Sequence, residues 1–220
     1  ADYILSYKGV KLAIVEAKSD EKDVSEGVAQ AKLYAEMLDI RFTYATNGDK
    51  IYAIDMQSGE EDEISAYPSP QELWEMTFGD VDEWRDKFNQ QPLYSNGTKQ
   101  PRYYQEIAIN KALTSIAKGK GRILLTLATG TGKTFIAFQI CYKLFHTKWN
   151  VKKTGNRPRI LFLADRNILV DQSILQDFAP LEKTIYKVDF SDKECLKKIA
   201  AHEVNFALYH QMVGHNDEEH

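Results

Sequence analysis

The apolar and polar positions of the first ninety residues switch between the period of a strand and that of a helix. Short alternating runs predict four strands, at residues 3–7, 11–17, 41–46 and 50–55. Apolar residues at helical spacing predict three helices, at residues 23–38, 70–77 and 81–89. Lys8-Gly9 and Asn47-Gly48 favour turns between strands, and the acidic run 58–63 is expected to be a solvated turn. This half of the chain predicts a mixed α/β unit.

Strands and helices alternate beyond residue 100. The same patterns predict helices at residues 102–118, 133–147 and 167–178, and strands at residues 122–127, 159–164 and 205–209. Such alternation is typical of a parallel sheet with helices on both faces. Proline, glycine, serine and asparagine gather near residues 90–100 and indicate a linker. We therefore expect two α/β domains, at residues 1–90 and 91–220.

The charge of the chain changes sign at the same place. Residues 1–90 hold 9 Lys and Arg against 20 Asp and Glu, and residues 91–220 hold 19 against 12, which gives net charges of −11 and +7. The basic half is compatible with a polyanionic partner, and the change of sign supports a boundary. Solvated surface charge would give the same counts, so charge alone does not identify a ligand.

Composition excludes several classes of protein. No run of about 18 apolar residues is present, so the sequence predicts no membrane span. The two cysteines, Cys141 and Cys195, are far apart, which argues against a disulfide scaffold or a zinc ribbon and fits a reducing cytoplasm. The first residues lack an initiating methionine and the pattern of a signal peptide, so we expect a segment of a longer protein.

A glycine-spaced loop, LATGTGKTF at residues 127–135, lies between a predicted strand and a predicted helix. Its glycines permit a turn that aims backbone N–H groups at phosphate oxygens, and the helix start adds the positive end of a dipole. Lys133 is expected to reach the phosphates of ATP, and the Thr134 hydroxyl to ligate Mg²⁺. The expected nucleotide-binding residues of this loop are Thr129, Gly130, Thr131, Gly132, Lys133 and Thr134. Leu127 departs from the usual small residue at the start of the spacing, and a chance glycine turn before a helix is the alternative.

The segment ATGTGKT resembles motif I of superfamily 2 helicases and translocases, which implies an ATP-binding RecA-like lobe. Arg102 and Gln105, in RYYQ, resemble the Q-motif of that superfamily, in which the glutamine amide pairs with adenine. ILFLADRNILVDQ resembles motif Ia, so the resemblance implies that Asp165 and Arg166 contact a nucleic-acid backbone. Simpler interpretations are a surface helix residue for Gln105 and a helix cap for Asp165-Arg166.

The acidic box that completes such a motor is not found in the sequence. Asp217-Glu218-Glu219 forms an acidic tail with no apolar strand before it, so it receives no such role. We therefore expect an incomplete RecA-like lobe that binds ATP without hydrolysing it efficiently.

A second candidate site lies near the N-terminus. Asp2 opens the first strand, and Glu16 and Lys18 share one face of the second. Two carboxylates can bind Mg²⁺, and a lysine can orient water or stabilise negative charge during phosphodiester cleavage. Gln30 and Tyr34 share a face of the following helix. The simpler interpretations are a solvated ion pair on the strand and core packing for Tyr34.

The order D…E-x-K…Q-x-x-x-Y resembles the RecB-like branch of the PD-(D/E)-x-K nucleases, although Ala1 stands where proline is usual. The resemblance implies a partial restriction-endonuclease-like domain at residues 1–90. It implies five catalytic residues, Asp2, Glu16, Lys18, Gln30 and Tyr34. Asp2 and Glu16 would hold the metal of this domain, and Thr134 would hold the metal that accompanies ATP.

A nuclease followed directly by a superfamily 2 motor resembles the R (restriction and motor) subunit of type I restriction enzymes over essentially the whole chain. The resemblance implies ATP- and Mg²⁺-dependent translocation on duplex DNA, remote cleavage, and a complex with methyltransferase (M) and specificity (S) subunits. Two alternatives remain from the residues themselves. One is a stand-alone repair helicase-nuclease, and the other is a DNA-binding scaffold with a degenerate nuclease fold.

Overall fold

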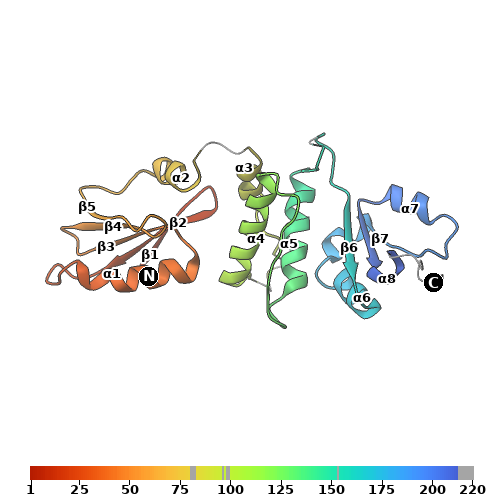
Figure 1. Cartoon of the computed structure of the whole chain (residues 1–220), viewed down its shortest axis with the longest axis horizontal. Coiled ribbons are helices and arrows are strands. Elements are labelled where there is room, and N and C mark those ends of the chain that lie inside the picture. The colour runs from red at the N-terminus through yellow and green to blue at the C-terminus, as the bar shows by residue number, and fades with distance from the viewer. Residues whose placement is uncertain (80–82, 96, 98–99, 153, 213–220) are drawn as a thin grey trace, which may run out of the picture. The chain divides into compact units, whose positions relative to one another are not determined.

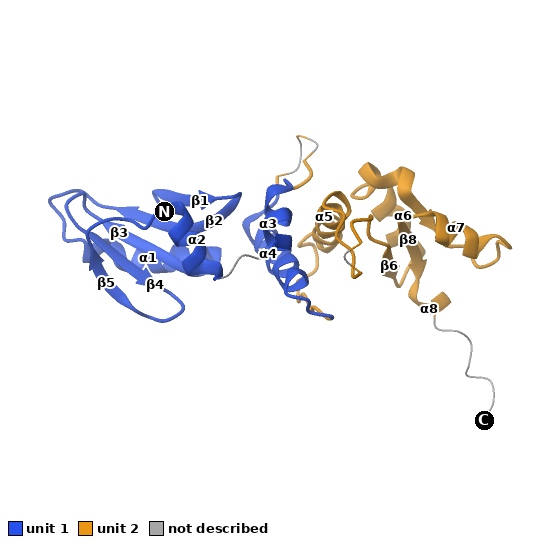
Figure 2. Cartoon of the chain, turned by 90° about the horizontal axis from the view of Figure 1, so that it is seen from above, with its two compact units in different colours: residues 1–92, 101–121 blue, residues 93–100, 122–220 orange. Residues whose placement is uncertain are grey.

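The structure is a computed structural model that describes residues 1–79, 83–95, 97, 100–152 and 154–212 (Figure 1). The acidic tail at 217–219 therefore lies outside the described residues. The chain divides into two compact units, residues 1–92 with 101–121 and residues 93–100 with 122–220 (Figure 2). None of the helices in the described part is long and apolar enough to cross a membrane.

The first unit is built on a mixed five-stranded sheet. Its strands are β1 (Tyr3–Tyr7), β2 (Val10–Ala17), β3 (Phe42–Thr46), β4 (Ile51–Asp55) and β5 (Glu61–Ile64), in the order β1-β2-β3-β4-β5. β2 and β3 run parallel because α1 (Ser25–Leu38) carries the chain back between them, whereas the hairpin neighbours run antiparallel. The strands and the first helix thus follow the predicted order closely.

Two helices cover opposite faces of this sheet (Figure 1). On one face Ile14 packs with Ala35 of α1 and with Ile40. On the other, Ala13 and Val15 pack against Leu73 and Trp74 of α2 (Pro70–Phe78). Neighbouring residues of β2 serve opposite cores, as strand geometry requires, so the sheet lies between two apolar layers.

The sequence predicts a solvated turn for the acidic run 58–63, but only its first part lies outside a strand. Its second part is β5, which pairs in antiparallel register with β4 from Ile54↔Glu61 to Ile51↔Ile64. Glu61 forms an ion pair with Lys32 of α1. Acidic residues have low strand propensity, but cross-strand pairing at a sheet edge outweighs that preference here.

Residues 101–121 belong to the first unit rather than to the second half of the chain, where the sequence had placed them. They form α4 (Tyr103–Ala117), which packs against α3 (Glu83–Gln90). Part of the expected linker belongs to the second unit, because the buried amide of Gln139 both accepts from the Tyr94 N–H and donates to the Tyr94 carbonyl, at 2.9 Å each.

The second unit contains a parallel sheet of β6 (Ile160–Ala164), β7 (Ile185–Lys187) and β8 (Val204–Leu208), in the order β6-β8-β7. Its helical segments are α5 (Lys133–His146), α6 (Asn167–Leu175), the 3-10 helix η1 (Ala179–Thr184), α7 (Cys195–Ala201) and α8 (Tyr209–Met212). Phe138 of α5 and Phe178 pack with Phe206 on one face of the sheet, and Cys195 of α7 packs on Ala207 on the other. The predicted parallel sheet with helices on both faces is present.

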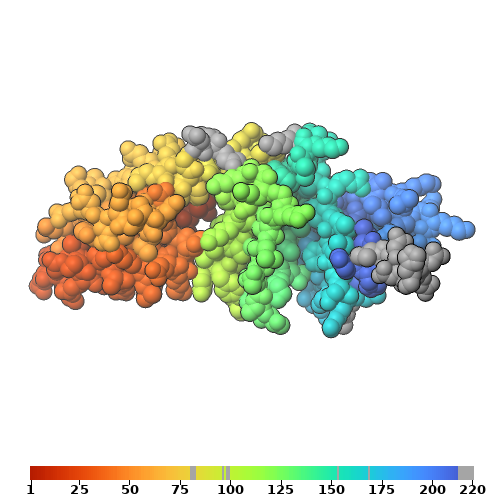
Figure 3. Space-filling view, viewed as in Figure 1, coloured from red at the N-terminus to blue at the C-terminus, as the bar shows by residue number. Residues whose placement is uncertain are grey.

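The strand predicted at residues 122–127 does not form. The segment runs along the surface after α4 (Figure 3), and Leu124 is 89% exposed. A strand is stable only when a neighbour satisfies its backbone groups, and no strand among the described residues pairs with this one. The apolar pattern was correct for a strand, but pattern alone does not supply the pairing partner. The helix predicted to reach residue 178 also ends early, at Leu175.

We predict that Phe178 carries much of the stability of the second unit. Its fully buried ring contacts the rings of Phe138, Phe162 and Phe206 at centroid distances of 5.0–5.5 Å. Phe178→Ala should therefore lower the free energy of unfolding by about 3–5 kcal/mol in urea denaturation. The matched variant Phe190→Ala removes a ring that is 47% exposed and should cost less than about 1 kcal/mol. Equal losses of unfolding free energy for the two variants would contradict the role of Phe178 in this core.

Candidate functional site

The end of β2 brings the N-terminal candidate residues together. The carboxylate of Asp2 accepts a hydrogen bond from the backbone N–H of Ala17 at 2.7 Å, which fixes it beside the strand that carries Glu16. Just beyond the strand, the Lys18 N–H donates to the Thr46 carbonyl of β3 at 2.8 Å. The backbone of Lys18 is therefore held by the sheet although it lies outside the strand.

Glu16 is a buried charge with one partnered oxygen. Its side chain points into the layer between β2 and α1, and the residue is only 2% exposed. The Lys18 ammonium donates to Oε1 of Glu16 at 2.9 Å. Oε2 has no hydrogen-bond partner among the described residues, although the nitrogen of Ala1 lies 3.6 Å away. A buried carboxylate oxygen without a hydrogen bond is costly unless another cation or donor reaches it.

Lys18 is held on two sides. Besides Glu16, it donates to Oε1 of Gln30 at 3.0 Å. The hydrogen bond to Glu16 raises the pKa of Lys18 above its ordinary value, against the opposing effect of desolvation, so the ammonium stays charged at neutral pH. A charged donor with a fixed position is what stabilisation of a phosphate oxygen requires.

Gly27 lets α1 approach the sheet closely at this point. A Cβ built on Gly27 would lie 3.3 Å from Cβ of Ala45, and 3.6 Å from Cγ of both Glu16 and Lys18. Gly27 is not among the site residues that the sequence predicts. Its signal is the spacing of the buried small residues Gly27, Ala31 and Ala35, four apart along one face of the helix.

Tyr34 lies one turn beyond Gln30, and its ring is half-buried. It packs against Ile14, Ala35 and Ile40, which form the apolar layer under α1. Tyr34 thus has a packing role in the structure, and no hydrogen bond joins it to Glu16 or Lys18. A catalytic role for its hydroxyl therefore remains a hypothesis.

The residues at the end of β2 fit a magnesium ion in one specific respect. Oε2 of Glu16 is a buried carboxylate oxygen without a hydrogen bond among the described residues, and such an oxygen can serve as a metal ligand. Within the described part of the chain, no group of three or more His, Cys, Asp or Glu side chains could hold a metal. A bound Mg²⁺ would therefore rest on Asp2 and Glu16 with water or phosphate oxygens, which is common for this ion.

The glycine loop leads into α5 in the expected way. Gly130 and Gly132 have φ values of 79° and 82°, in the left-handed region that the turn requires. The helix begins at Lys133, directly after the loop. The Lys133 ammonium donates to the carbonyls of Leu127 and Ala128, at 3.3 and 3.1 Å, and the Thr131 hydroxyl donates to Ala128 at 2.7 Å. The Lys133 side chain thus folds back over the loop. An anion bound in the loop would compete with these two carbonyls for its ammonium group.

Other predicted site residues lie at two helix starts. Gln105 is buried at the start of α4, where its carboxamide oxygen accepts from the Arg102 N–H at 2.9 Å. The Arg102 guanidinium donates to the Tyr104 hydroxyl at 3.2 Å. Asp165 and Arg166 are strongly exposed between β6 and α6, with 3.9 Å between their charged groups. The hydrogen bond that caps the helix explains the position of the Gln105 side chain. The exposed guanidinium of Arg166 is accessible to a ligand.

The structure therefore gathers the candidates into separate groups. Asp2, Glu16, Lys18 and Gln30 form one cluster in the first unit. The loop residues from Thr129 to Thr134 form another in the second unit, while Arg102 and Gln105 belong to the first unit.

Comparisons with known proteins give mutually consistent results. Residues 98–220 match the family model described as "Type III restriction enzyme, res subunit". The whole chain is 38% identical to the type I restriction enzyme EcoAI endonuclease subunit of Escherichia coli and spans 27% of it. Over 79% of the chain, it is 28% identical to the type I restriction enzyme EcoKI endonuclease subunit of Escherichia coli K12, of which it spans 18%.

A solved structure gives the same relationship. A fragment assigned to the HsdR subunit of a type I restriction enzyme from Vibrio vulnificus YJ016 matches with a TM-score of 0.76 and 39% identity. The match covers 93% of this chain and 36% of that chain. The chain thus spans well under half of each of these relatives.

We predict that the Tyr34 ring, and not its hydroxyl, stabilises the fold. Tyr34→Ala removes contacts with Ile14, Ala35 and Ile40 and should lower the free energy of unfolding by about 2–3 kcal/mol, whereas Tyr34→Phe should change it by less than about 0.5 kcal/mol. Met37→Ala on the same helix, where the side chain is exposed, is the matched control. The packing role is excluded if Tyr34→Ala costs no more than Met37→Ala in urea denaturation.

Proposed function

We propose that the first unit of this chain cleaves duplex DNA and that its second unit serves ATP-dependent translocation. The chain belongs to the res-subunit family of restriction enzymes and falls among the R subunits of type I enzymes. The observation that supports cleavage most directly is the cluster at the end of β2. There a buried carboxylate, Glu16, holds a charged lysine that also contacts Gln30, and keeps one oxygen without a hydrogen bond among the described residues. A solvated ion pair, the simpler interpretation, would not bury the carboxylate.

Each residue of this cluster has a distinct part in the proposed cleavage. Asp2 and Glu16 would hold Mg²⁺, which when bound supplies Lewis-acid stabilisation of the phosphate and a water of lowered pKa. The Asp2 carboxylate is fixed by the Ala17 N–H. Lys18 stays charged at neutral pH and is positioned to stabilise the negative charge that develops on the cleaved phosphate. Gln30 orients the Lys18 ammonium from the opposite side.

The second unit would bind ATP through the glycine loop. Lys133 would exchange its two carbonyl contacts for the β- and γ-phosphates, a stronger pairing because the acceptors are charged. The Thr134 hydroxyl would ligate the accompanying Mg²⁺. Arg102 and Gln105 are proposed to contact adenine, and for this the Gln105 oxygen would have to leave its helix cap. We expect the 220-residue chain to bind ATP without efficient turnover.

Contacts with DNA are proposed to involve the backbone rather than the bases. Arg166 is exposed beside Asp165 at the end of β6, and an arginine there can pair with phosphate. Such contacts depend strongly on salt concentration and carry little sequence information. Sequence recognition would come from the M and S subunits with which the complete protein is proposed to assemble.

We predict that ATP affinity depends on Lys133. Lys133→Ala removes a charge-assisted contact worth roughly 1.5–3 kcal/mol, so the affinity of the chain for ATP should fall by about tenfold or more in isothermal titration calorimetry. Lys183→Ala, which removes an exposed lysine from the same unit, should leave the affinity unchanged. Equal ATP affinity for Lys133→Ala and the unaltered chain would refute the nucleotide site.

We predict that a substitution at Glu16 abolishes DNA cleavage and leaves ATP hydrolysis intact. In the full-length enzyme with its M and S subunits, Glu16→Gln keeps the side-chain shape and removes the charge that holds Mg²⁺ and Lys18. Cleavage of plasmid DNA should be lost while ATP hydrolysis continues, because the nucleotide occupies a separate loop. Glu36→Gln, on the exposed side of α1, is the matched control.

Two outcomes would contradict this assignment. If the Glu16→Gln enzyme cuts DNA as fast as the Glu36→Gln enzyme, the cluster is not the nuclease centre. If the unaltered enzyme produces no metal-dependent nicking, the scaffold alternative is favoured. A Tyr34→Phe enzyme of full activity would leave Tyr34 with packing alone.

A further inference from the structure

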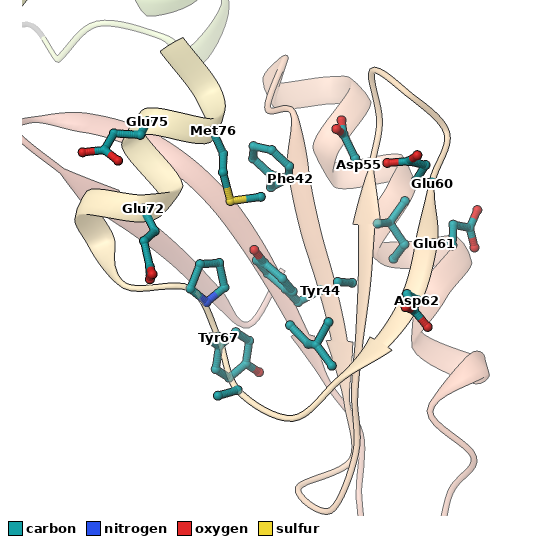
Figure 4. Close-up of a pocket in the computed structure, with 15 residues that line it drawn as sticks. Phe42, Tyr44, Asp55, Glu60, Glu61, Asp62, Tyr67, Glu72, Glu75 and Met76 are labelled. Carbon is teal, nitrogen blue, oxygen red and sulfur yellow. The ribbon is translucent and has the colours of Figure 1, made fainter. Parts of the chain in front are cut away.

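A hollow of about 700 Å³ lies on the face of the first unit's sheet that is opposite to Glu16 and Lys18. Figure 4 shows β3, β4 and β5 on one side of it, and α2 with the loop that carries Tyr67 on the other. Its volume is in the range of sites that enclose drug-sized ligands. It therefore has room for more than one side chain of a ligand.

The register of the strands explains the hollow. Tyr44, Ala53 and Asp62 lie opposite one another on β3, β4 and β5, so they form one row across the sheet. Ala53, in the middle of the row, is too small to fill the space between its neighbours. Tyr67 contacts the Tyr44 ring edge-on at a centroid distance of 5.2 Å and closes one side.

One polar group of a buried residue opens into the hollow and makes no hydrogen bond within the described part of the chain. Tyr44 is 2% exposed, and its hydroxyl makes no hydrogen bond with any described residue. The hydroxyl points toward the α2 side of the hollow (Figure 4). Burial, with a smaller effect of Tyr67, raises the pKa of Tyr44 to about 12, so the hydroxyl stays neutral and its oxygen can accept a hydrogen bond from a ligand.

The rim of the hollow is acidic, and several of its carboxylates have no cation beside them. Asp55 is neutralised by Arg41, at 2.6 Å, and Glu61 by Lys32. By contrast, four rim residues form no ion pair within the described part of the chain: Glu60, Asp62, Glu72 and Glu75. An aromatic floor beneath uncompensated carboxylates suits a cation on an apolar stem.

We propose that this hollow binds a lysine- or arginine-bearing segment of a partner protein. The carboxylates at the rim that form no ion pair make this face negative, which favours a basic partner here. The apolar floor accommodates the stems of the side chains, and the carboxylates pair with their charged ends. β5 is the edge strand beside the hollow, so the backbone of the segment can pair with it. This proposal does not depend on the proposed nuclease or ATP activities.

The test is binding of a synthetic heptapeptide of alternating threonine and lysine to the 220-residue chain, measured by calorimetry at low ionic strength. The double variant Asp62→Asn, Glu75→Gln should weaken binding by about tenfold or more, since each charged contact contributes substantially. The matched double variant Glu63→Gln, Glu36→Gln removes two charges elsewhere in the same unit and should leave affinity unchanged. Glu63 alternates with Asp62 along β5 and therefore faces the other side of the sheet.

Two further variants test the interior. Ala53→Leu fills the hollow without changing charge and should abolish binding, with an unchanged far-ultraviolet dichroism spectrum showing that the chain folds. Tyr44→Phe removes the unpartnered hydroxyl and should weaken binding severalfold.

The proposal is overturned if the peptide binds all variants equally, or if a peptide with glutamate in place of lysine binds as well. Binding of spermidine with the same dependence on these variants would overturn it in favour of a small polycation. A structure of the longer protein in which its own residues fill the hollow would overturn it too.

Discussion

Burial of the Glu16 carboxylate at the end of β2 is the constraint on which the organisation of the first unit depends. A buried negative charge is stable only when cations or strong donors surround it. Lys18 provides the cation, at 2.9 Å, and the pairing of Lys18 with Thr46 of the neighbouring strand keeps it in place. Removing either charge would leave the other without its main partner. The two charges therefore depend on each other whether or not they take part in catalysis.

The helix that covers this pair is adapted to it. Gly27 allows α1 to approach β2 and β3 closely, and the next turn places Gln30 against the Lys18 ammonium. Further along, Tyr34 returns to ordinary packing over Ile14. One helix therefore combines a polar end, which positions a charged group, with an apolar end, which stabilises the fold.

The two faces of the same sheet differ in what they leave unsatisfied. On the α1 face a carboxylate oxygen of Glu16 lacks a hydrogen bond, which suits a cation of small size. On the α2 face the Tyr44 hydroxyl lies in a wide hollow with an acidic rim, which suits a cation carried on a longer stem. The alternation of side chains along β2, β3 and β4 keeps these two environments apart even though they share a backbone.

Local pattern was sufficient for much of the fold and of both candidate sites. Alternation and turn residues placed β1 to β4, and helical spacing placed α1, because each of these elements buries one face against a neighbour. Glu-x-Lys on one strand face and Gln30 on the next helix predicted which side chains would meet. The glycines of the loop at 127–135 predicted its left-handed residues and the start of α5.

Tertiary structure decided what depends on partners distant in sequence. The run 58–63 became an edge strand because β4 offered it hydrogen bonds, and residues 122–127 remained unpaired despite a strand-like pattern. The roles of two small residues, Gly27 of α1 and Ala53 beneath the hollow, depend on the side chains that lie opposite them in the fold. Sequence pattern records which face of an element is apolar, but only the folded chain determines which element that face meets and which polar groups are left without a partner.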